Sequence, residues 1–510
     1  MKHEIFVNMG PRETRVAVRE ADKITELLIE RDAERGVAGG IYKGKVTRVL
    51  PGMQAAFVDI GLERGAFLYV GDYRADLDDV EVDENGSETR RSPDEGNGGR
   101  GRRSGPLPQI DKVLAEGQEV LVQVSKEPLG TKGARITSRV SLAGRHLVLV
   151  PWMQRVGISR RIGSDRERRR LRSIVSDLRR EDLGFIVRTV SHGVTESDLR
   201  ADVEYLTTLW DSVNERRQAV RQVPALVYEE PKLHLRILRD LVSSQTKEIV
   251  VDDPDAYGEM QDFVRRFMAA PRPRITHYTN TEPLYDRERI EQQIEEGLSR
   301  KVGLKSGGSL IIDQSEALTA IDVNTGRFTG GKGRSLEETI LKTNMEAVRE
   351  IAHQLRFRNI GGLIILDLID MEQTSNREKV YKSLLDALRE DKAKTNLLKI
   401  SELGLVEMTR KRTRENLVQQ LCDPCPTCEG RGYLQSSRTV CNKILRELPK
   451  AADYVKGQTL TLRTHPEVAD LLFSQESEAM HALENKLSRV VAIRADPRLH
   501  REQFEITATP

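Results

Sequence analysis

The segment at residues 39–70 limits the fold more than any other part of the sequence. It reads GGIYKGKVTRVLPGMQAAFVDIGLERGAFLYV, and its apolar and polar residues alternate in short runs that Gly and Pro51-Gly52 interrupt. Alternation with a period of two, broken by turn residues, is typical of short strands with one buried face. The same pattern resumes at 117–125 and 133–142. The sequence therefore predicts a small β-barrel at 39–142.

A long insertion interrupts this predicted barrel at residues 72–108. Its first half is acidic, from Asp76 to Glu84, and its second half reads RRSPDEGNGGRGRRSGP. The insertion has too few apolar residues to form a core, which is typical of a disordered loop.

The rest of the chain mixes helices and strands. Residues 1–35 predict a hairpin and a third strand or short helix, which is too little to fold alone, so we expect it to pack against a later segment. A basic helix at 160–180 and the strand GFIVRTVS at 184–191 follow the barrel. Residues 301–420 read as α/β, with a helix from Leu336 to Phe357. With 510 residues, the chain is expected to be an α+β protein of three or four domains.

Composition excludes several classes of protein. No apolar run approaches the ~18–20 residues of a membrane span, and the N-terminus has no signal-peptide pattern. The 81 Lys and Arg residues against 79 Asp and Glu give a net charge of +2, so the overall charge does not indicate a nucleic-acid partner. Four cysteines are too few for a disulfide framework in a chain of this length. We therefore expect a cytoplasmic protein without a membrane span.

Two aspartates at strand ends predict a metal site. Asp322 ends the apolar strand ALTAID, and Asp367 lies in LIILDLID. Aspartates on neighbouring strands can share a Mg²⁺ ion whose other ligands are water and phosphate, and such an ion can activate water for phosphodiester hydrolysis. Asn324 points the same way as Asp322 on an extended chain, where it can hold a water or the scissile phosphate. The alternative is that these aspartates cap strands or pair with arginines.

Cysteines predict a second metal site. The spacing of Cys425 and Cys428 turns two thiolates toward one ion, but apart from the overlapping spacing of Cys422 and Cys425 the sequence has no further CxxC and no histidine near this segment. Zn²⁺ takes four ligands, so one solution is a zinc ion shared by two copies of the chain. The alternatives are a turn without metal and a redox CxxC, which usually opens a helix in a thioredoxin-like unit that we do not expect here. Cys422 is a spare thiol or an alternative ligand, and Cys441 is the other remaining thiol.

The predicted barrel and the basic helix give weaker indications of a binding site. Basic residues alternate with apolar residues near Phe57 and Phe67, and barrels of this type bind single strands by stacking bases on aromatic rings. The alternative is that both rings are ordinary core residues. Arg188 and Thr189 supply the guanidinium and hydroxyl that a phosphate pocket requires, although an Arg-rich helix is more often a solvated face.

Five motifs occur in the same order as in a known family. They are IYKGKVTRVLPGMQAAFVDIG, KSGGSLIIDQSEALTAIDVNTG, IGGLIILDLIDM, GLVEMTRKRTRENL and CPTC. On these motifs, nearly end to end, the chain resembles the ribonuclease E/G family. It has no long disordered scaffold arm, which, with the PLGTKGAR stretch, favours the shorter of the family's two types.

The resemblance implies a Mg²⁺-dependent, single-strand-specific endoribonuclease. It implies a preference for AU-rich RNA with a 5′-monophosphate, products with 5′-phosphate and 3′-hydroxyl ends, and a role in ribosomal RNA 5′ maturation and messenger RNA decay. The implied partners are ribosomal RNA precursors, messenger RNA and a second copy of the chain, joined through structural Zn²⁺ into a homodimer. Whether two such dimers pair into a tetramer is left open by the resemblance.

The resemblance also assigns individual residues. The catalytic residues are Asp322, Asn324 and Asp367, of which the two aspartates bind Mg²⁺. The remaining assignments are Phe57, Phe67 and Lys132 as RNA contacts of an S1-type barrel, Gly144, Val148, Arg188 and Thr189 as the 5′-phosphate pocket, and Cys425 and Cys428 as the zinc link.

The family's fold then organises the chain. An S1-type OB barrel and a 5′ sensor are inserted into a ribonuclease H-like subdomain, and a deoxyribonuclease I-like α/β catalytic subdomain, the zinc link and a small C-terminal domain follow. The expected ranges are 1–35 with 232–298 for the ribonuclease H-like subdomain, 36–142 for the barrel, 143–231 for the sensor, 299–418 for the catalytic subdomain, 419–433 for the zinc link and 434–510 for the C-terminal domain.

Two rival functions belong to other classes. A non-catalytic RNA-binding or ribosome-associated protein would keep the barrel and the zinc link but would have no need for Asp322, Asn324 and Asp367 together. A metal-dependent phosphodiesterase acting on DNA would keep the aspartates but would show little preference for ribose and none for the 5′ terminus.

Overall fold

The structure is a computed structural model that forms two compact units, Met1–Gln420 and Leu421–Pro510. It describes residues 2–34, 36–73, 81–82, 88–89, 109–128, 133–243, 245–268, 272–326, 336–401, 403–412, 414–454, 457 and 459–509. Within these ranges, none of the helices combines the length and the apolar character that crossing a membrane requires.

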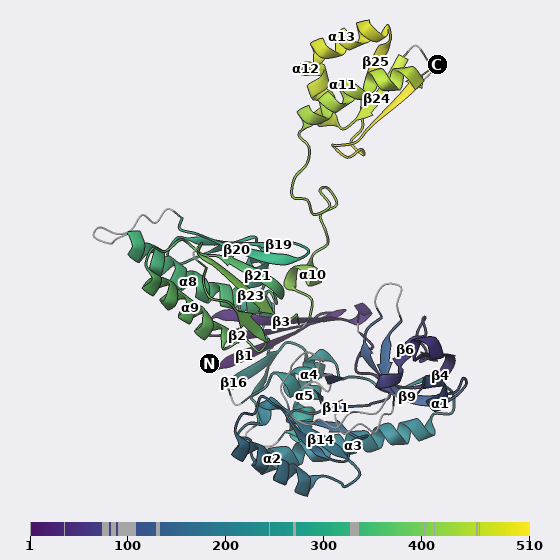
Figure 1. The fold of residues 1–510 in the computed structure, drawn as a ribbon, viewed down its shortest axis with the longest axis vertical. Helices are drawn as coiled ribbons and strands as arrows, with labels where there is room; N and C mark the ends of the chain where they lie inside the picture. The colour runs from purple at the N-terminus through teal and green to yellow at the C-terminus, as the bar shows by residue number, and fades with distance from the viewer. Residues whose placement is uncertain are drawn as a thin grey trace. The chain divides into compact units, whose positions relative to one another are not determined.

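Strands from two distant parts of the chain form one five-stranded sheet (Figure 1). Its order is β17-β16-β1-β2-β3, and β1 pairs in parallel with β16. The strands are β1 (His3–Met9), β2 (Glu13–Glu20), β3 (Lys23–Arg31), β16 (Thr246–Val251) and β17 (Ile275–His277). Helices α4 (Leu233–Asp240) and α5 (Pro254–Phe267) supply apolar side chains to its core. The first three strands therefore pack against a later segment, as their pattern predicts.

The predicted β-barrel is present and closed. Strand β4 pairs with both β5 and β9, so the order β4-β5-β6-β10-β9 returns to its start. The strands are β4 (Ile41–Leu50), β5 (Ala55–Asp59), β6 (Ala66–Tyr69), β9 (Glu119–Lys126) and β10 (Arg135–Thr137). A further strand, β15 (Ala225–Tyr228), pairs with β4 from far along the chain. The insertion predicted to be disordered lies mostly outside the described residues; within it, β7 (Glu81–Val82) pairs with β8 (Glu88–Thr89).

Residues between the barrel and α4 form a four-stranded sheet with two helices. The order is β11-β12-β14-β13, made of β11 (Leu142–Ala143), β12 (Leu147–Val150), β13 (Val156–Ile158) and β14 (Gly184–Val187). The basic segment forms α2 (Asp165–Leu178), where Ser164 caps the first turn by accepting from the Glu167 N–H. Helix α3 (Glu196–Ala219) begins with a capping box between Thr195 and Asp198, which is why it starts at this point.

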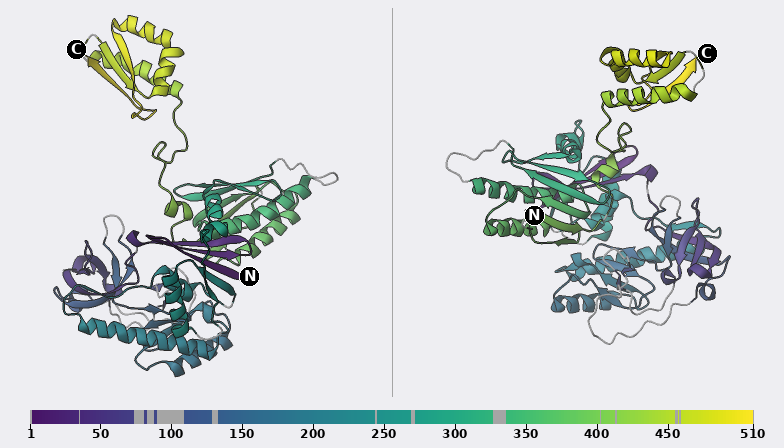
Figure 2. Two further views of the ribbon diagram at one scale, coloured as in Figure 1. Left: turned by 180° about the vertical axis from the view of Figure 1, so that it is seen from behind. Right: turned by 45° about the horizontal axis from the view of Figure 1, so that its top comes forward.

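A six-stranded sheet carries the two strand-end aspartates. Its order is β18-β19-β20-β21-β23-β22, made of β18 (Lys301–Gly303), β19 (Ser309–Gln314), β20 (Leu318–Asn324), β21 (Gly362–Asp367), β22 (Thr395–Leu397) and β23 (Leu405–Arg410). Helices α8 (Leu336–Phe357) and α9 (Thr374–Leu388) lie side by side against it (Figures 1 and 2). The apolar stripe of α8, including Ala347, Val348 and Ile351, is fully buried, as helical spacing predicts.

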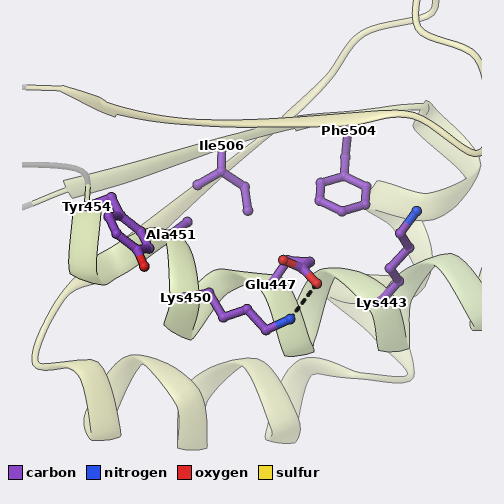
Figure 3. A pocket seen from close by; sticks show the side chains of 7 residues that line it. All are labelled: Lys443, Glu447, Lys450, Ala451, Tyr454, Phe504 and Ile506. Carbon is purple, nitrogen blue, oxygen red and sulfur yellow. Dashed lines mark hydrogen bonds and ion pairs between the residues drawn. The ribbon is translucent and has the colours of Figure 1, made fainter.

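The second unit is a small α/β domain with its own core. Strand β24 (Thr459–Thr464) pairs in parallel with β25 (Val490–Ala495) and antiparallel with β26 (Phe504–Thr509). Helices α11 (Ser437–Tyr454), α12 (Pro466–Ser474) and α13 (Ser477–Leu487) cover the sheet. A shallow pocket of about 530 Å³ lies between α11 and β26 (Figure 3). None of the predicted site residues lines it.

Candidate functional site

Asp322 and Asp367 lie side by side at the ends of two adjacent strands. Strands β20 and β21 run in parallel, and Asp322 is the register partner of Asp367. Along β20 the buried residues Ile321 and Val323 alternate with the exposed Asp322 and Asn324, so the polar residues face solvent together. The Asn324 amide donates to Asp322 Oδ2 over 2.7 Å. The structure thus brings the three predicted catalytic residues together.

The charges at this site repel one another. Burial raises the pKa of Asp367 above its ordinary value, and the nearby carboxylates of Asp322 and Asp370 raise it further. A cation at the site would relieve that repulsion. Asp370 was not among the predicted site residues, although it lies three residues after Asp367 in the same motif.

The donor set fits Mg²⁺ better than a closed metal site. Among the residues that the structure describes, no three His, Cys, Asp or Glu side chains form a metal-binding group. Mg²⁺ usually keeps several waters and binds through one or two carboxylates and substrate phosphate. Asp322 and Asp367 match that requirement in number, in chemistry and in their exposure to solvent.

A basic and aromatic row crosses the barrel. Phe57 and Phe67 are register partners, and their ring centroids lie 6.0 Å apart in an edge-to-face arrangement. Arg48 pairs with Phe57 on one side, and Arg135 pairs with Phe67 on the other. Both rings are partly exposed, whereas their neighbours Ala56, Val58, Ala66 and Leu68 are buried in the barrel core. The rings therefore lie outside the core. The third predicted RNA contact, Lys132, lies outside the described residues.

Three of the four predicted 5′-pocket residues lie close together. The Arg188 Nη1 atom donates to the Gly144 carbonyl over 2.6 Å. The Thr189 hydroxyl is hydrogen-bonded to that of Ser159, with 2.7 Å between the oxygens. Val148 differs, because it is fully buried in β12 between β11 and β14. Its side chain supports the sheet rather than facing a ligand.

Asp202, a residue that the sequence did not single out, shapes this pocket. Its buried carboxylate on α3 accepts the backbone N–H groups of Arg145, His146 and Leu147 over 2.7–3.0 Å. A Cβ atom at Gly144 would lie 2.6 Å from Asp202 Oδ2, so only glycine fits there. The contact joins residues 57 positions apart, and therefore no local pattern indicates it.

His146 in the same turn makes the stability of this region depend on pH. Burial, together with the charge of Arg145, lowers its pKa to about 4. The unfolded chain, with a pKa of about 6.5, binds the proton more tightly than the folded chain. Stability is therefore intact above pH 6.5 and falls as the pH drops toward 4.

We expect His146→Leu to reduce this acid-dependent loss. Between pH 7 and pH 5 the wild type should lose about 2 kcal/mol of unfolding free energy through this group, and the variant should not. Urea unfolding at both pH values measures the difference. His192→Leu, which removes an exposed histidine nearby, is the matched control and should behave as the wild type. An equal loss in the His146 variant would contradict the prediction.

The cysteine segment is a turn in the second unit. The Glu429 N–H donates to the Cys425 carbonyl, and the Arg431 N–H donates to the Cys428 carbonyl, each over 2.8 Å. Hydrogen bonds from the backbone N–H groups of Cys428 and Thr427 lower the pKa of the Cys425 thiol, which favours the thiolate that binds metal. Cys422 is exposed, whereas Cys441 is buried in the domain core. Cys441 is therefore not available to this site.

The fold brings a histidine to the turn, although none is near it in the sequence. His500 Nε2 lies 2.7 Å from the Thr427 carbonyl, and its Nδ1 accepts the Glu502 N–H over 3.2 Å. Because both ring nitrogens are used, His500 is committed to holding the turn. Glu502 adds an ion pair to Arg431 at 2.9 Å. The turn is thus fixed to its own domain, with Cys425 exposed and Cys428 partly exposed.

Comparison with known proteins identifies the family. A family model described as the ribonuclease E/G family matches residues 141–413, and one described as the RNase E/G thioredoxin-like domain matches residues 424–509. The chain belongs to the ribonuclease E/G family. The second match corrects our expectation that no thioredoxin-like unit is present. Cys425 and Cys428 nevertheless do not open a helix, because α11 begins only at Ser437.

The most informative relatives match the shorter type of the family. The chain is 42% identical to ribonuclease G of Haemophilus influenzae over 504 residues, 99% of each protein. It is 42% identical to ribonuclease G of Escherichia coli (strain K12) over 506 residues, again 99% of each. Ribonuclease E of the same strain is 35% identical over 95% of this chain but only 44% of its own length. The expected resemblance is confirmed.

Proposed function

We propose that this protein is a Mg²⁺-dependent endoribonuclease that cuts single-stranded, AU-rich RNA and prefers a 5′-monophosphate. Membership of the family, with full-length similarity to ribonuclease G of two bacteria, makes the chain an endoribonuclease. The observation that carries the proposed chemistry is the register pairing of Asp322 with Asp367. The AU-rich preference rests on the resemblance to the family.

The six-stranded sheet that carries Asp322 and Asp367 would bind the scissile phosphodiester. Bound Mg²⁺ supplies Lewis-acid chemistry and lowers the pKa of a bound water. Asp322 and Asp367 would hold the ion, and the Asn324 amide fixes the Asp322 carboxylate through its hydrogen bond. The buried strand residues beneath them hold the carboxylates in a constant geometry, which limits reorganisation during the reaction. Products would carry 5′-phosphate and 3′-hydroxyl ends.

Two other surfaces would bind the RNA. The row Arg48, Phe57, Phe67 and Arg135 combines cations for phosphates with rings on which bases stack, which is the arrangement that single strands need. Arg188 and Thr189 would contact the 5′-terminal phosphate. Because stacking on aromatic rings tolerates any base, the barrel would fix the strand without reading its sequence.

We further propose a cytoplasmic homodimer that acts in ribosomal RNA 5′ maturation and messenger RNA decay. The two cysteines of the turn, Cys425 and Cys428, support a zinc ion shared between two chains. The four free cysteines support a reducing compartment.

One cleavage assay tests the proposal. A fluorescent AU-rich RNA with a 5′-monophosphate or a 5′-hydroxyl is incubated with the protein in Mg²⁺ or in EDTA. We expect cleavage only with Mg²⁺, and faster cleavage of the monophosphate RNA. A DNA strand of the same sequence is the control. Binding without cleavage in every condition would instead support a non-catalytic RNA-binding protein.

We expect Arg188→Leu to erase the preference for the 5′-monophosphate. The variant removes the guanidinium that contacts the Gly144 carbonyl, and leucine offers no donor to a phosphate. The kcat/KM for the monophosphate RNA should fall about tenfold, the loss typical of one charged hydrogen bond, to the level of the hydroxyl RNA. Arg180→Leu, in an exposed ion pair with Asp182, is the control. An unchanged preference would remove Arg188 from the sensor.

A further inference from the structure

An acidic side chain lies beside the arginine of the proposed 5′-phosphate pocket. Asp240 Oδ1 is 3.2 Å from Arg188 Nη1 and 3.4 Å from its Nη2. A carboxylate in this place competes with a phosphate for the same guanidinium, because both are anions that accept its N–H groups. Asp240 therefore weakens the binding of any anion to Arg188.

The carboxylate is fixed independently of Arg188. Arg239 holds it with two hydrogen bonds, Nε to Oδ1 over 3.1 Å and Nη2 to Oδ2 over 3.0 Å. Arg239 is itself anchored by Glu230 at 2.7 Å and by the Ala143 carbonyl at 3.3 Å. The end of α4 is thus tied to the end of β11 (Figure 1). Asp240 is therefore held in place by contacts that do not involve Arg188.

The carboxylate is also ionised at neutral pH. Burial alone would raise the pKa of Asp240, but the charges and hydrogen bonds of Arg239 and Arg188 outweigh it and hold the pKa below its ordinary value. Two arginines therefore face two carboxylates, Asp240 and Glu230. At Arg188 itself, the positive charge is therefore partly offset by Asp240.

The attraction by Arg188 and the repulsion by Asp240 together distinguish ligands by their charge. The Arg188 side chain is only 13% exposed, so the attraction it offers is limited to the phosphate that reaches it. Repulsion from Asp240, 33% exposed, grows with every further charge on the ligand. A monophosphate meets the attraction with little repulsion. A triphosphate brings more negative charge to the same carboxylate.

We propose that Asp240 is a specificity-determining residue that restricts the pocket to a 5′ end with a single phosphate. The inference rests on the proposed sensing of the 5′ end. It assigns the rejection of a triphosphate to charge at a named residue, in addition to the size of the pocket.

The test compares one AU-rich RNA with a 5′-hydroxyl, a 5′-monophosphate and a 5′-triphosphate. Asp240→Asn keeps the shape of the side chain and an oxygen that accepts from Arg239, but removes the charge. We expect the ratio of kcat/KM for triphosphate over monophosphate RNA to rise about tenfold relative to the wild type. Asp182→Asn, which removes the acid of an arginine ion pair elsewhere in the same region, should leave the ratio unchanged.

A second variant separates charge from structure. Asp240→Glu keeps the negative charge and should keep the wild-type ratio. An unchanged ratio in Asp240→Asn, an equal change in both variants, or loss of activity on all three RNAs in both would show that Asp240 only supports the fold, and each would overturn the inference. Failure of the proposed sensing has a different signature, since the wild type would then treat monophosphate and hydroxyl RNA alike.

Discussion

Asp322→Asn is expected to reduce cleavage by at least about 1,000-fold while leaving RNA binding intact. The amide has the shape of the carboxylate but is a poor ligand for Mg²⁺, which prefers charged oxygens. Asp322 is exposed at the end of β20 and accepts a hydrogen bond from Asn324. The fold therefore does not depend on its charge, and the loss should appear in kcat.

The measurement needs cleavage, binding and metal readouts on one preparation. Cleavage rates are followed against Mg²⁺ concentration, and RNA affinity is measured by fluorescence anisotropy. Asp313→Asn is the matched control because this aspartate lies on the adjacent strand β19, is exposed, and pairs with Arg300. It should cleave as the wild type. Loss of RNA binding in Asp322→Asn would make the residue structural, and full cleavage would move the active site elsewhere.

The candidate catalytic residues were predictable because their signal is local. Asp322 and Asn324 alternate with apolar residues along one strand, and Asp367 ends another apolar strand, so the sequence indicates both their exposure and their position at a sheet end. The sequence does not reveal the order of the strands in the six-stranded sheet. Only the parallel pairing of β20 with β21 makes Asp322 and Asp367 neighbours. The family resemblance, not periodicity, supplied that step.

The features of the candidate sites that the sequence did not indicate depend on contacts between residues far apart in the chain. The row Arg48, Phe57, Phe67 and Arg135 forms only because four strands pair in a particular register. One of these strands has a bulge next to Arg48. Asp202, Asp240 and His500 act through partners far along the chain. Val148 matches a family motif, but its burial follows from pairing on both sides of β12. A motif identifies a position, whereas the fold determines what its side chain can reach.

The thioredoxin-like domain was missed for a related reason. The usual sign of such a domain is a CxxC at the start of a helix, and here the CxxC lies in a turn before α11. The parallel pair β24 and β25 is formed across two intervening helices. The domain is therefore recognised from its topology and from the family model rather than from the cysteines.

Cys425→Ser is expected to abolish zinc binding and shift the protein from dimer to monomer. His500 and Glu502 fix the turn to the domain, and the turn leaves Cys425 exposed and Cys428 partly exposed. Two thiolates are half of a tetrahedral site, and in the proposed zinc link a second chain supplies the other half. We expect one zinc ion per two chains in the wild type, and almost none in the variant, since removal of one cysteine per chain removes two of four ligands.

Cys422→Ser is the discriminating control for this prediction. Cys422 is exposed and lies three residues before Cys425, so it is the remaining thiol that can reach the turn. If Cys425 and Cys428 are the ligands, Cys422→Ser keeps both zinc and the dimer, and only Cys425→Ser loses them together. Mass spectrometry measures the zinc content, and sedimentation measures the mass of the assembly. Together they show which cysteines bind zinc and whether the dimer depends on it. A dimer that persists without zinc would place the subunit contact elsewhere, and one zinc per chain would assign a third ligand to Cys422.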